Sequence, residues 1–359
     1  MNDERLARIF VSSFPGFGSR SLRRIKGGFL TWEKAWLASP DALAKVGVSE
    51  KAGLRFVEWR RDFDAAAFLK LLEDEGIAVL FPEDEGYPQL LAVSSDPPEI
   101  LFVRGTLDDA PAISVVGTRK ITAYGEQCTE AIVSGLAARG FLIVSGLALG
   151  VDGAVHQTTL GAGGRTIAVL GTGADDASLY PREHVSLAQK MMANGGAVIS
   201  EFSPGSDSRK EHFPIRNRLI ASLSLATLVI EAAIDSGSLI TAKLALEENR
   251  EVLAVPGPIW SAQSAGTNKL IKLGAKVCTC AEDVIEAIAL DRPDLVAQTR
   301  AALPLDPKEQ AILDFLDEPR HIDDIGRLEG MDPVAASSIM AVLELKGLVK
   351  PIGGQMWTR

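Results

Sequence analysis

The sequence predicts a doubly wound α/β domain built on a mostly parallel sheet, with a helical module before it and a winged-helix-like module after it. The clearest observation is the order of patterns within residues 113–146. A buried apolar run, Ile113–Val116, ends in a glycine turn, an amphipathic stretch follows, and a second apolar run begins at Phe141. Short buried runs separated by a helical pattern are typical of a βαβ unit with parallel strands.

The same alternation continues to about residue 290. Successive units of this kind predict one doubly wound sheet with helices on both faces. Two earlier apolar runs, Ile77–Leu80 and Ile100–Val103, predict strands that extend the sheet at one edge. The other predicted strands are Thr166–Leu170, Ala197–Ser200, Thr227–Glu231, Glu251–Val255 and Ala275–Cys278.

The chain divides into four predicted segments. They are a helical module at residues 1–75, the α/β domain at 76–290, a linker at 291–303 and a winged-helix-like module at 304–359. In the first segment, glycine turns at Phe14–Gly18 and Val46–Val48 each precede a helical pattern. Paired helices with such turns can present N–H groups to a phosphate. This pattern resembles a SAM or helix-hairpin-helix module, and a plain small helical domain is the alternative.

The last segment predicts three helices and a terminal strand pair, as in a winged helix-turn-helix. Its third predicted helix has only Lys346 at its end as a basic residue. A recognition helix usually carries Arg, Lys, Asn or Gln on its outer face. The sequence therefore favours protein contact or scaffolding for this module, with DNA reading as the alternative.

The charge and the cysteines limit the class of protein. The net charge of −10 argues against coating of nucleic acid by overall positive charge, but leaves room for a local basic site. No apolar run approaches a membrane span, and Met1–Glu4 lacks the features of a signal peptide. Cys128, Cys278 and Cys280 form neither a disulfide framework nor a zinc pattern. We expect a cytoplasmic protein with reduced thiols.

Basic side chains gather near the N-terminus and in mid-chain. The two clusters are Arg5, Arg8, Arg20, Arg23, Arg24 and Lys26, and Arg209, Lys210, Arg216 and Arg218. Arg216 and Arg218 stand two apart, so they cannot share one helical face; one could bind a ligand while the other ties the loop to the protein. Phe213 could stack on a base, and anchoring of the loop in the core is the alternative.

Phosphate-compatible turns follow four of the predicted strands. They are Gly117–Arg119, Ser145–Gly146, Gly171–Gly173 and Asp235–Ser238. The carboxyl ends of parallel strands meet at one edge, where ligands bind. Ser236, Gly237 and Ser238 also begin a predicted helix, whose free N–H groups attract anions. We therefore expect a phosphate-bearing ligand at this edge, with Arg119 as a cationic fork.

Known nucleotide and metal fingerprints are missing. The sequence has no GxxxxGK[ST] loop, and Gly171–Gly173 lacks the spacing of a dinucleotide site. No histidine has a partner at metal-ligand spacing. Asp152 and His156 could form an acid–base pair, with a structural hydrogen bond favoured. Glu231 could be catalytic, with orientation of the Ser236–Ser238 loop or of Arg119 as the alternative.

Several stretches together closely resemble the DNA-processing protein A family, also called Smf. Among them are VVGTRKITAYG, SGLALGVDGAVHQTTL, HFPIRNRLIASLS and VIEAAIDSGSLITAKLALEENREVLAVPG, in family order between Ile113 and Ala275. The resemblance implies an extended Rossmann-like domain that binds single-stranded DNA without catalysis. It also implies protection of incoming strands during natural transformation, loading of the RecA recombinase, and a homodimer formed through the Rossmann domain.

The resemblance also implies particular site residues. Gly117, Thr118 and Arg119 would grip a phosphate, and Ser145, Gly146 and Gly150 would line the same pocket. The basic residue after Tyr-Pro falls on Arg182, and Arg216, Asn217 and Arg218 match the FPxRNR motif. The sequence departs from the family at His184, where Asn is usual.

An enzyme is the rival class. Nucleoside-monophosphate phosphoribohydrolases of the LOG or lysine-decarboxylase-like type share this kind of fold and a late anion loop. Their loop reads PGGxGT followed by a glutamate pair, whereas this chain reads DSGSLITAKLALEE from Asp235. No acidic pair directly follows the loop, so no general base is evident. We expect no catalytic residue, cofactor or metal.

Overall fold

The computed structural model describes residues 3–108, 110–289, 305–328, 331 and 333–359. Its centre is a nine-stranded sheet in the order β1-β2-β6-β5-β4-β3-β7-β8-β9. The strands are β1 (Ile77–Leu80), β2 (Leu101–Gly105), β3 (Ala112–Val116), β4 (Leu142–Ser145), β5 (Thr166–Leu170), β6 (Ala197–Ser200), β7 (Ala226–Val229), β8 (Glu251–Ala254) and β9 (Lys276–Val277). Every predicted strand is therefore present.

The sheet is doubly wound, as predicted. From β6 to β9 every neighbouring pair is parallel. The chain runs outward from β3 through β4 and β5 to β6, then returns to β7 on the other side of β3. This reversal creates a topological switch point between β3 and β7, where ligands bind in open α/β sheets.

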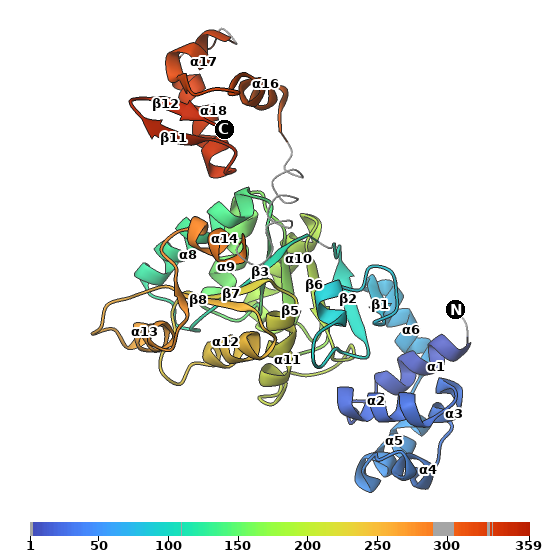
Figure 1. Cartoon of the computed structure of the whole chain (residues 1–359). Helices are drawn as coiled ribbons and strands as arrows, with labels where there is room; N and C mark the ends of the chain where they lie inside the picture. The colour runs from blue at the N-terminus through green and yellow to red at the C-terminus, as the bar shows by residue number, and fades with distance from the viewer. Residues whose placement is uncertain (1–2, 109, 290–304, 329–330, 332) are drawn as a thin grey trace.

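Helices cover both faces of the sheet (Figure 1). One layer packs on the core formed by Val115, Ile143 and Leu228, and the other on the core formed by Val116, Val144 and Val229. The first layer contains α8 (Ala123–Ala138), α9 (Val151–Gly161) and α14 (Ala281–Ala289). On the same side of the sheet, α10 (Val185–Ala193) packs on a separate core that includes Ala168 and Val198. The second contains α7 (Gln89–Ala92), α11 (His212–Ser222), α12 (Ser238–Glu247) and α13 (Ala265–Lys272). Helix layers on both faces explain why β3 and β5 are buried along their whole length and carry only one polar residue each, Ser114 and Thr166.

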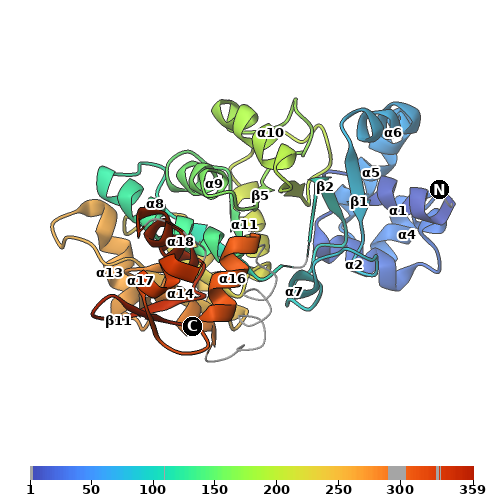
Figure 2. The ribbon, with the colours of Figure 1, turned by 90° about the horizontal axis from the view of Figure 1, so that it is seen from above.

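The predicted edge extension is confirmed. Strand β1 pairs antiparallel with β2, and β2 pairs antiparallel with β6. These two strands bring the N-terminal module to this side of the sheet (Figures 1 and 2).

The N-terminal module is helical, as predicted. It contains α1 (Asp3–Ser12), α2 (Ser19–Gly28), α3 (Trp32–Trp36), α4 (Pro40–Lys45), α5 (Glu50–Asp62) and α6 (Ala65–Asp74). Most of its basic cluster serves docking rather than a ligand. Arg5 pairs with Asp84, Arg8 with Glu83 and Glu99, Arg23 with Asp96, and Lys26 with Glu99. These carboxylates belong to the α/β domain and its edge strands, so the pairs tie the module to it.

The C-terminal module has winged-helix architecture. It contains α16 (Pro307–Phe315), β10 (Arg320–His321), α17 (Ile322–Leu328), α18 (Pro333–Leu345), β11 (Lys350–Gly353) and β12 (Met356–Thr358). Asp306 begins α16 with a capping box completed by Glu309. The predicted linker, residues 291–303, lies outside the described residues. Within the described part of the chain, no helix is long and apolar enough to cross a bilayer.

Candidate nucleic-acid interface

A pocket of about 450 Å³ lies at the switch point between β3 and β7. Turns after both strands and the start of α11 form its walls. The predicted site residues in its lining are Gly117, Thr118, Arg119, Phe213, Arg216, Asn217, Ser236, Gly237 and Ser238. Residues distant in sequence therefore meet at the carboxyl edge, as the strand-end argument predicts. We call this the switch-point pocket.

The turn after β3 is held from both sides by backbone hydrogen bonds. The Thr118 N–H donates to the Glu231 carbonyl at 2.7 Å, and the Thr118 carbonyl accepts from the Val151 N–H at 3.0 Å. A Cβ at Gly117 would collide with Val151, so glycine is required for this close approach. The turn is thereby a fixed support for the side chains of Arg119 and Lys120.

Arg119 and Lys120 are exposed at the pocket, and neither makes an ion pair with any residue that the structure describes. The Arg119 guanidinium carbon lies 5.0 Å from the centre of the Phe213 ring, within cation–π range. The ring restrains the guanidinium without neutralising it. Both cations therefore remain free to bind an anion.

The opposite wall is the start of α12. The hydroxyls of Ser236 and Ser238 lie 2.8 Å apart, and Gly237 stands between them. The N–H groups of Ser238, Leu239 and Ile240 donate within this turn, whereas the N–H of Gly237 has no acceptor among the residues that the structure describes. The helix dipole also favours an anion at this end of α12. Asp235, which is exposed in the same lining, opposes this attraction with its negative charge.

Arg216 forms the floor of the pocket. Its guanidinium is buried and donates to the carbonyls of Gly146, at 2.7 Å, and Val169. Burial lowers the pKa of Arg216 to about 10, although the nearby Asp152 carboxylate opposes this shift. Of the two roles considered for the arginines, Arg216 has the structural one, because its donors are used by strand-end carbonyls.

Ser145, Gly146 and Gly150 lie behind the pocket rather than in its lining. Ser145 is fully buried and donates to the Val115 carbonyl at 2.6 Å. Gly150 has a φ of +80°, and a Cβ there would collide with the Thr118 carbonyl. In this structure the three residues support the pocket by allowing its walls to pack closely together, and their contact with a ligand remains a prediction.

Comparison with known proteins agrees with this architecture. The model of the DNA recombination-mediator protein A family matches residues 78–289, and the DprA winged helix domain matches residues 296–355. The chain belongs to the DNA recombination-mediator protein A family. Protein Smf from Synechocystis sp. is 33% identical, with 100% of this chain and 99% of the relative aligned.

Two solved structures support the assignment. DNA processing protein A (DprA) from Streptococcus pneumoniae has a TM-score of 0.65 and 32% identity, covering 80% of this chain and 98% of that chain. DNA processing protein A from Helicobacter pylori, described for its single-stranded DNA binding mode, has a TM-score of 0.53 and 30% identity. It covers 60% of this chain and 96% of that chain. The resemblance to the DprA family is confirmed, and the phosphoribohydrolase alternative is not favoured.

Two arginines carried over from the DprA family lie outside the pocket lining. Arg218 is mostly buried, where it pairs with Asp96 and Glu201 and donates to the Ser19 hydroxyl at 2.9 Å. Arg182, in the short helix Arg182–His184, is exposed and donates to the Asp176 carbonyl at 2.6 Å. In this structure the Arg218 donors are used by Asp96 and Glu201 of the α/β domain and by Ser19 of the N-terminal module.

Phe213 is half-buried and lines the pocket. Its ring could therefore anchor the loop and still stack on a base, which are the two roles that the sequence predicts. Its ring centre lies 6.3 Å from that of Tyr180, which is 47% exposed. The two rings form an aromatic rim beside Arg119. A base could therefore stack at this rim while its phosphate lies in the pocket.

The candidate acid–base residues have structural hydrogen bonds. The Asp152 carboxylate accepts from the N–H groups of Gly146 and Ala148 at 3.1 and 3.3 Å, and burial raises its pKa. His156 is hydrogen-bonded through Nδ1 to the Thr166 hydroxyl at 2.7 Å, and burial lowers its pKa to about 3.

Glu231 is also structural. Its carboxylate accepts from the N–H and hydroxyl of Thr122, the N-cap residue of α8, at 2.9 and 2.7 Å. The carboxylate therefore orients the start of α8, while the main-chain carbonyl of Glu231 holds the turn that carries Arg119. In the described ranges no group of three or more His, Cys, Asp or Glu residues could hold a metal ion.

His184, the departure from the usual DprA family asparagine, also has a defined role. Its Nδ1 lies 2.8 Å from the Leu147 carbonyl. Leu147 has a φ of 60°, which is unusual for a residue with a side chain. The imidazole thus holds the loop after β4 in place, and the substitution retains a hydrogen-bonding group at this position.

Sequence reasoning missed Lys120, Thr241 and Gln263 in the lining. Lys120 directly follows Arg119, so its charge was a usable signal. Gln263 is brought in by the short helix Ala262–Ser264 after β8, and its Oε1 is buried without a hydrogen-bond partner among the described residues. No local pattern predicts such a contact.

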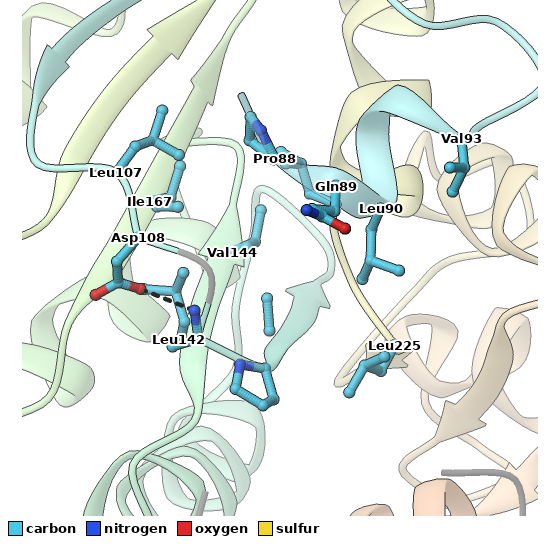
Figure 3. Close-up of a pocket in the computed structure, with 14 residues that line it drawn as sticks. Pro88, Gln89, Leu90, Val93, Leu107, Asp108, Leu142, Val144, Ile167 and Leu225 are labelled. Carbon is cyan, nitrogen blue, oxygen red and sulfur yellow. Dashed lines mark hydrogen bonds between the residues drawn. The ribbon is translucent and has the colours of Figure 1, made fainter. Parts of the chain in front are cut away.

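A second hollow, of about 490 Å³, lies at the opposite edge of the sheet (Figure 3). It is lined at the amino ends of strands by Ala112, Leu142 and Ile167, and by Leu90 from α7. Asp108 is its charged member, and this carboxylate already pairs with Arg165. Its apolar walls offer little to a phosphate, so the switch-point pocket is the better candidate.

Proposed function

We propose that this chain binds the backbone of single-stranded DNA at the switch-point pocket. The observation that carries the proposal is that Arg119 and Lys120 face the N-terminus of α12 without an ion-pair partner in the described part of the chain. Charged forks and backbone N–H donors together are a strong phosphate-binding combination. The Helicobacter pylori relative, described for its single-stranded DNA binding mode, supports the choice of ligand.

A single strand suits this pocket better than a duplex. The side chains that could bind a phosphate converge in a recess of about 450 Å³ rather than along an open face. The rim formed by Phe213 and Tyr180 offers ring faces, and only an unpaired strand has free base faces to stack there. Backbone contacts carry little sequence information, so binding should be largely independent of sequence.

We propose that binding occurs without catalysis. The carboxylate nearest the β7 turn, Glu231, accepts both of its hydrogen bonds from Thr122 and is 2% exposed. Asp152 is equally committed to backbone N–H groups and Arg216. Neither group is free to act as a general base on a bound nucleotide.

Membership of the DprA family supports a role in DNA uptake by natural transformation, in which the chain protects an incoming strand and helps to load RecA.

We also propose a homodimer through the β9 end of the sheet. Leu273 is 73% exposed and Val277 is 47% exposed there, on or beside an edge strand. A C2 pair would cover both residues with the same surface.

The decisive test compares single-stranded and duplex DNA of one sequence in a fluorescence-anisotropy titration. Tighter binding of the single strand is expected. In parallel, ATP and nucleoside monophosphates are incubated with the protein, and neither base nor phosphate should be released above background. Equal binding of duplex, or release that disappears in Glu231→Gln, would contradict the proposal.

A further inference from the structure

We propose that the cavity between the N-terminal module and the loop at residues 203–212 is a second subsite, which takes a nucleobase of the strand bound at the switch-point pocket. The inference rests on the proposed function, because it concerns the path of the same ligand. It gives the N-terminal module a direct part in DNA binding.

The cavity has a volume of about 250 Å³ and two walls of different character. The module supplies Trp59, Phe63 and Phe68, which are all half-buried. The α/β domain supplies Arg209 and His212. Ligand pockets usually span roughly 300–1,000 Å³, so this space suits one base rather than a longer segment. Aromatic side chains beside a cation are the recurring surface for unpaired bases.

The two cavities are joined by consecutive residues. His212 lines the module cavity and Phe213 lines the switch-point pocket. His212 is held in place, because its ring stacks on Phe202 at 4.0 Å and its Nδ1 lies 3.0 Å from the Gly171 carbonyl. A strand whose phosphate lies beside Arg119 therefore needs only to cross the start of α11 to reach the second cavity.

The charges around the second cavity support a backbone passing along it. Arg209 and Lys210 are exposed, and neither has an ion pair with a residue in the described ranges. Asp207 lines the same wall and offsets part of this charge. The subsite should therefore depend on stacking first and on one phosphate contact second.

The aromatic wall is kept beside the loop by the docking of the module. Arg5 and Arg8 of α1 pair with Asp84 and Glu83, on the α/β side of the interface. The ring centres of Trp59 and Phe63 are 4.5 Å apart, and those of Phe63 and Phe68 are 5.4 Å apart. The rings support one another, so the wall is formed before a ligand arrives.

Photo-crosslinking of the wild-type chain tests the path directly. Oligothymidylate with 5-iododeoxyuridine at successive positions is irradiated with the protein, and crosslinked peptides are identified by mass spectrometry. The proposal expects crosslinks at Trp59, Phe63 or Phe68, from a position a fixed number of nucleotides away from the one that reaches Phe213. Crosslinks confined to the switch-point pocket would overturn it.

Variants separate this proposal from the proposed function. Trp59→Leu should weaken binding of the same oligothymidylate about fivefold or more, as loss of one stacked base does. Arg209→Ala should flatten the log–log salt dependence by about 0.7. Lys45→Ala removes an exposed charge of α4 outside both cavities and should change neither quantity.

The outcomes are distinguishable. If the wild type binds and Arg119→Ala weakens binding, but a folded Trp59→Leu variant binds with unchanged affinity, the second subsite is refuted and the proposed function stands. If the wild type does not bind the oligonucleotide, the proposed function itself fails. Circular dichroism of Trp59→Leu guards against misfolding, and the crosslinks of the wild type need no variant.

Discussion

Replacement of Arg119 by alanine removes the guanidinium that the switch-point pocket presents to a phosphate. Arg119 is exposed and makes no ion pair with a described residue, so the folded state loses little with it. Surface substitutions of this kind usually change stability by about 0.5 kcal/mol or less. The turn itself remains, because Thr118 is held by the backbone of Glu231 and Val151.

The expected loss of affinity follows from the contact that disappears. A hydrogen bond to a charged group contributes about 1.5–3 kcal/mol, which corresponds to roughly a tenfold to hundredfold weaker Kd. The dipole of α12 and the charge of Lys120 remain in the Arg119→Ala variant. Binding should therefore weaken without disappearing, and the loss should be similar for different sequences.

Anisotropy titrations of a labelled oligothymidylate between about 50 and 200 mM salt give affinity and slope together. For the Arg119→Ala variant the log–log slope should fall by about 0.7, because one phosphate contact is lost. Lys45→Ala, a charge removed far from the pocket, is the matched control. A folded Arg119→Ala variant with unchanged affinity and slope would refute the assignment of the pocket.

Three further predictions follow from the geometry. Asp235→Asn should tighten binding of single-stranded DNA severalfold in the same titration, because it removes a carboxylate that opposes the phosphate. Arg218→Ala should lower the free energy of unfolding in urea by about 3 kcal/mol, since it leaves Glu201 mostly buried without its partner; weaker DNA binding at unchanged stability would contradict this structural role. The pKa of His156 is lowered to about 3 against about 6.5 in an unfolded chain, so the unfolded state takes up the proton first as the pH falls. The stability of the wild type should fall between about pH 6.5 and 3 by on the order of 4 kcal/mol more than that of His156→Gln, and parallel curves would exclude the effect.

The sheet could be predicted from the sequence because its strands are buried on both faces. Runs such as Ile113–Val116 and Thr166–Leu170 are apolar except for one hydroxyl residue each, and a nearly continuous apolar run is typical of a strand between two helix layers. The order of the strands in the sheet is harder to predict from the sequence, although the short, right-handed crossovers of a doubly wound domain allow few topologies. The domain boundaries remain a prediction.

The pocket was predictable where local chemistry marks it. Gly117–Arg119 and Ser236–Ser238 are phosphate-compatible turns after strands, and the structure brings them together. The arginines were harder, because an arginine that binds a ligand and one that binds carbonyls look alike in a sequence. Arg216 is buried against the carbonyls of Gly146 and Val169, and only the folded chain reveals that its charge is already used.

The Arg216–Asn217–Arg218 motif joins the pocket to the N-terminal module. Residues two apart on a helix point to nearly opposite sides. Arg216 accordingly faces the strand ends beneath the pocket, whereas Arg218 faces Ser19, Asp96 and Glu201 at the module. A single turn of α11 therefore fixes the pocket floor and the docking of the module at the same time. Helix α11 begins between the two cavities and is hydrogen-bonded to the module through Arg218 and Ser19. A shift of the module would therefore move both its own aromatic wall and, through α11, the pocket floor at Arg216. Such coupling would tie the position of the second cavity to that of the switch-point pocket, through contacts that α11 makes with both the sheet and the module.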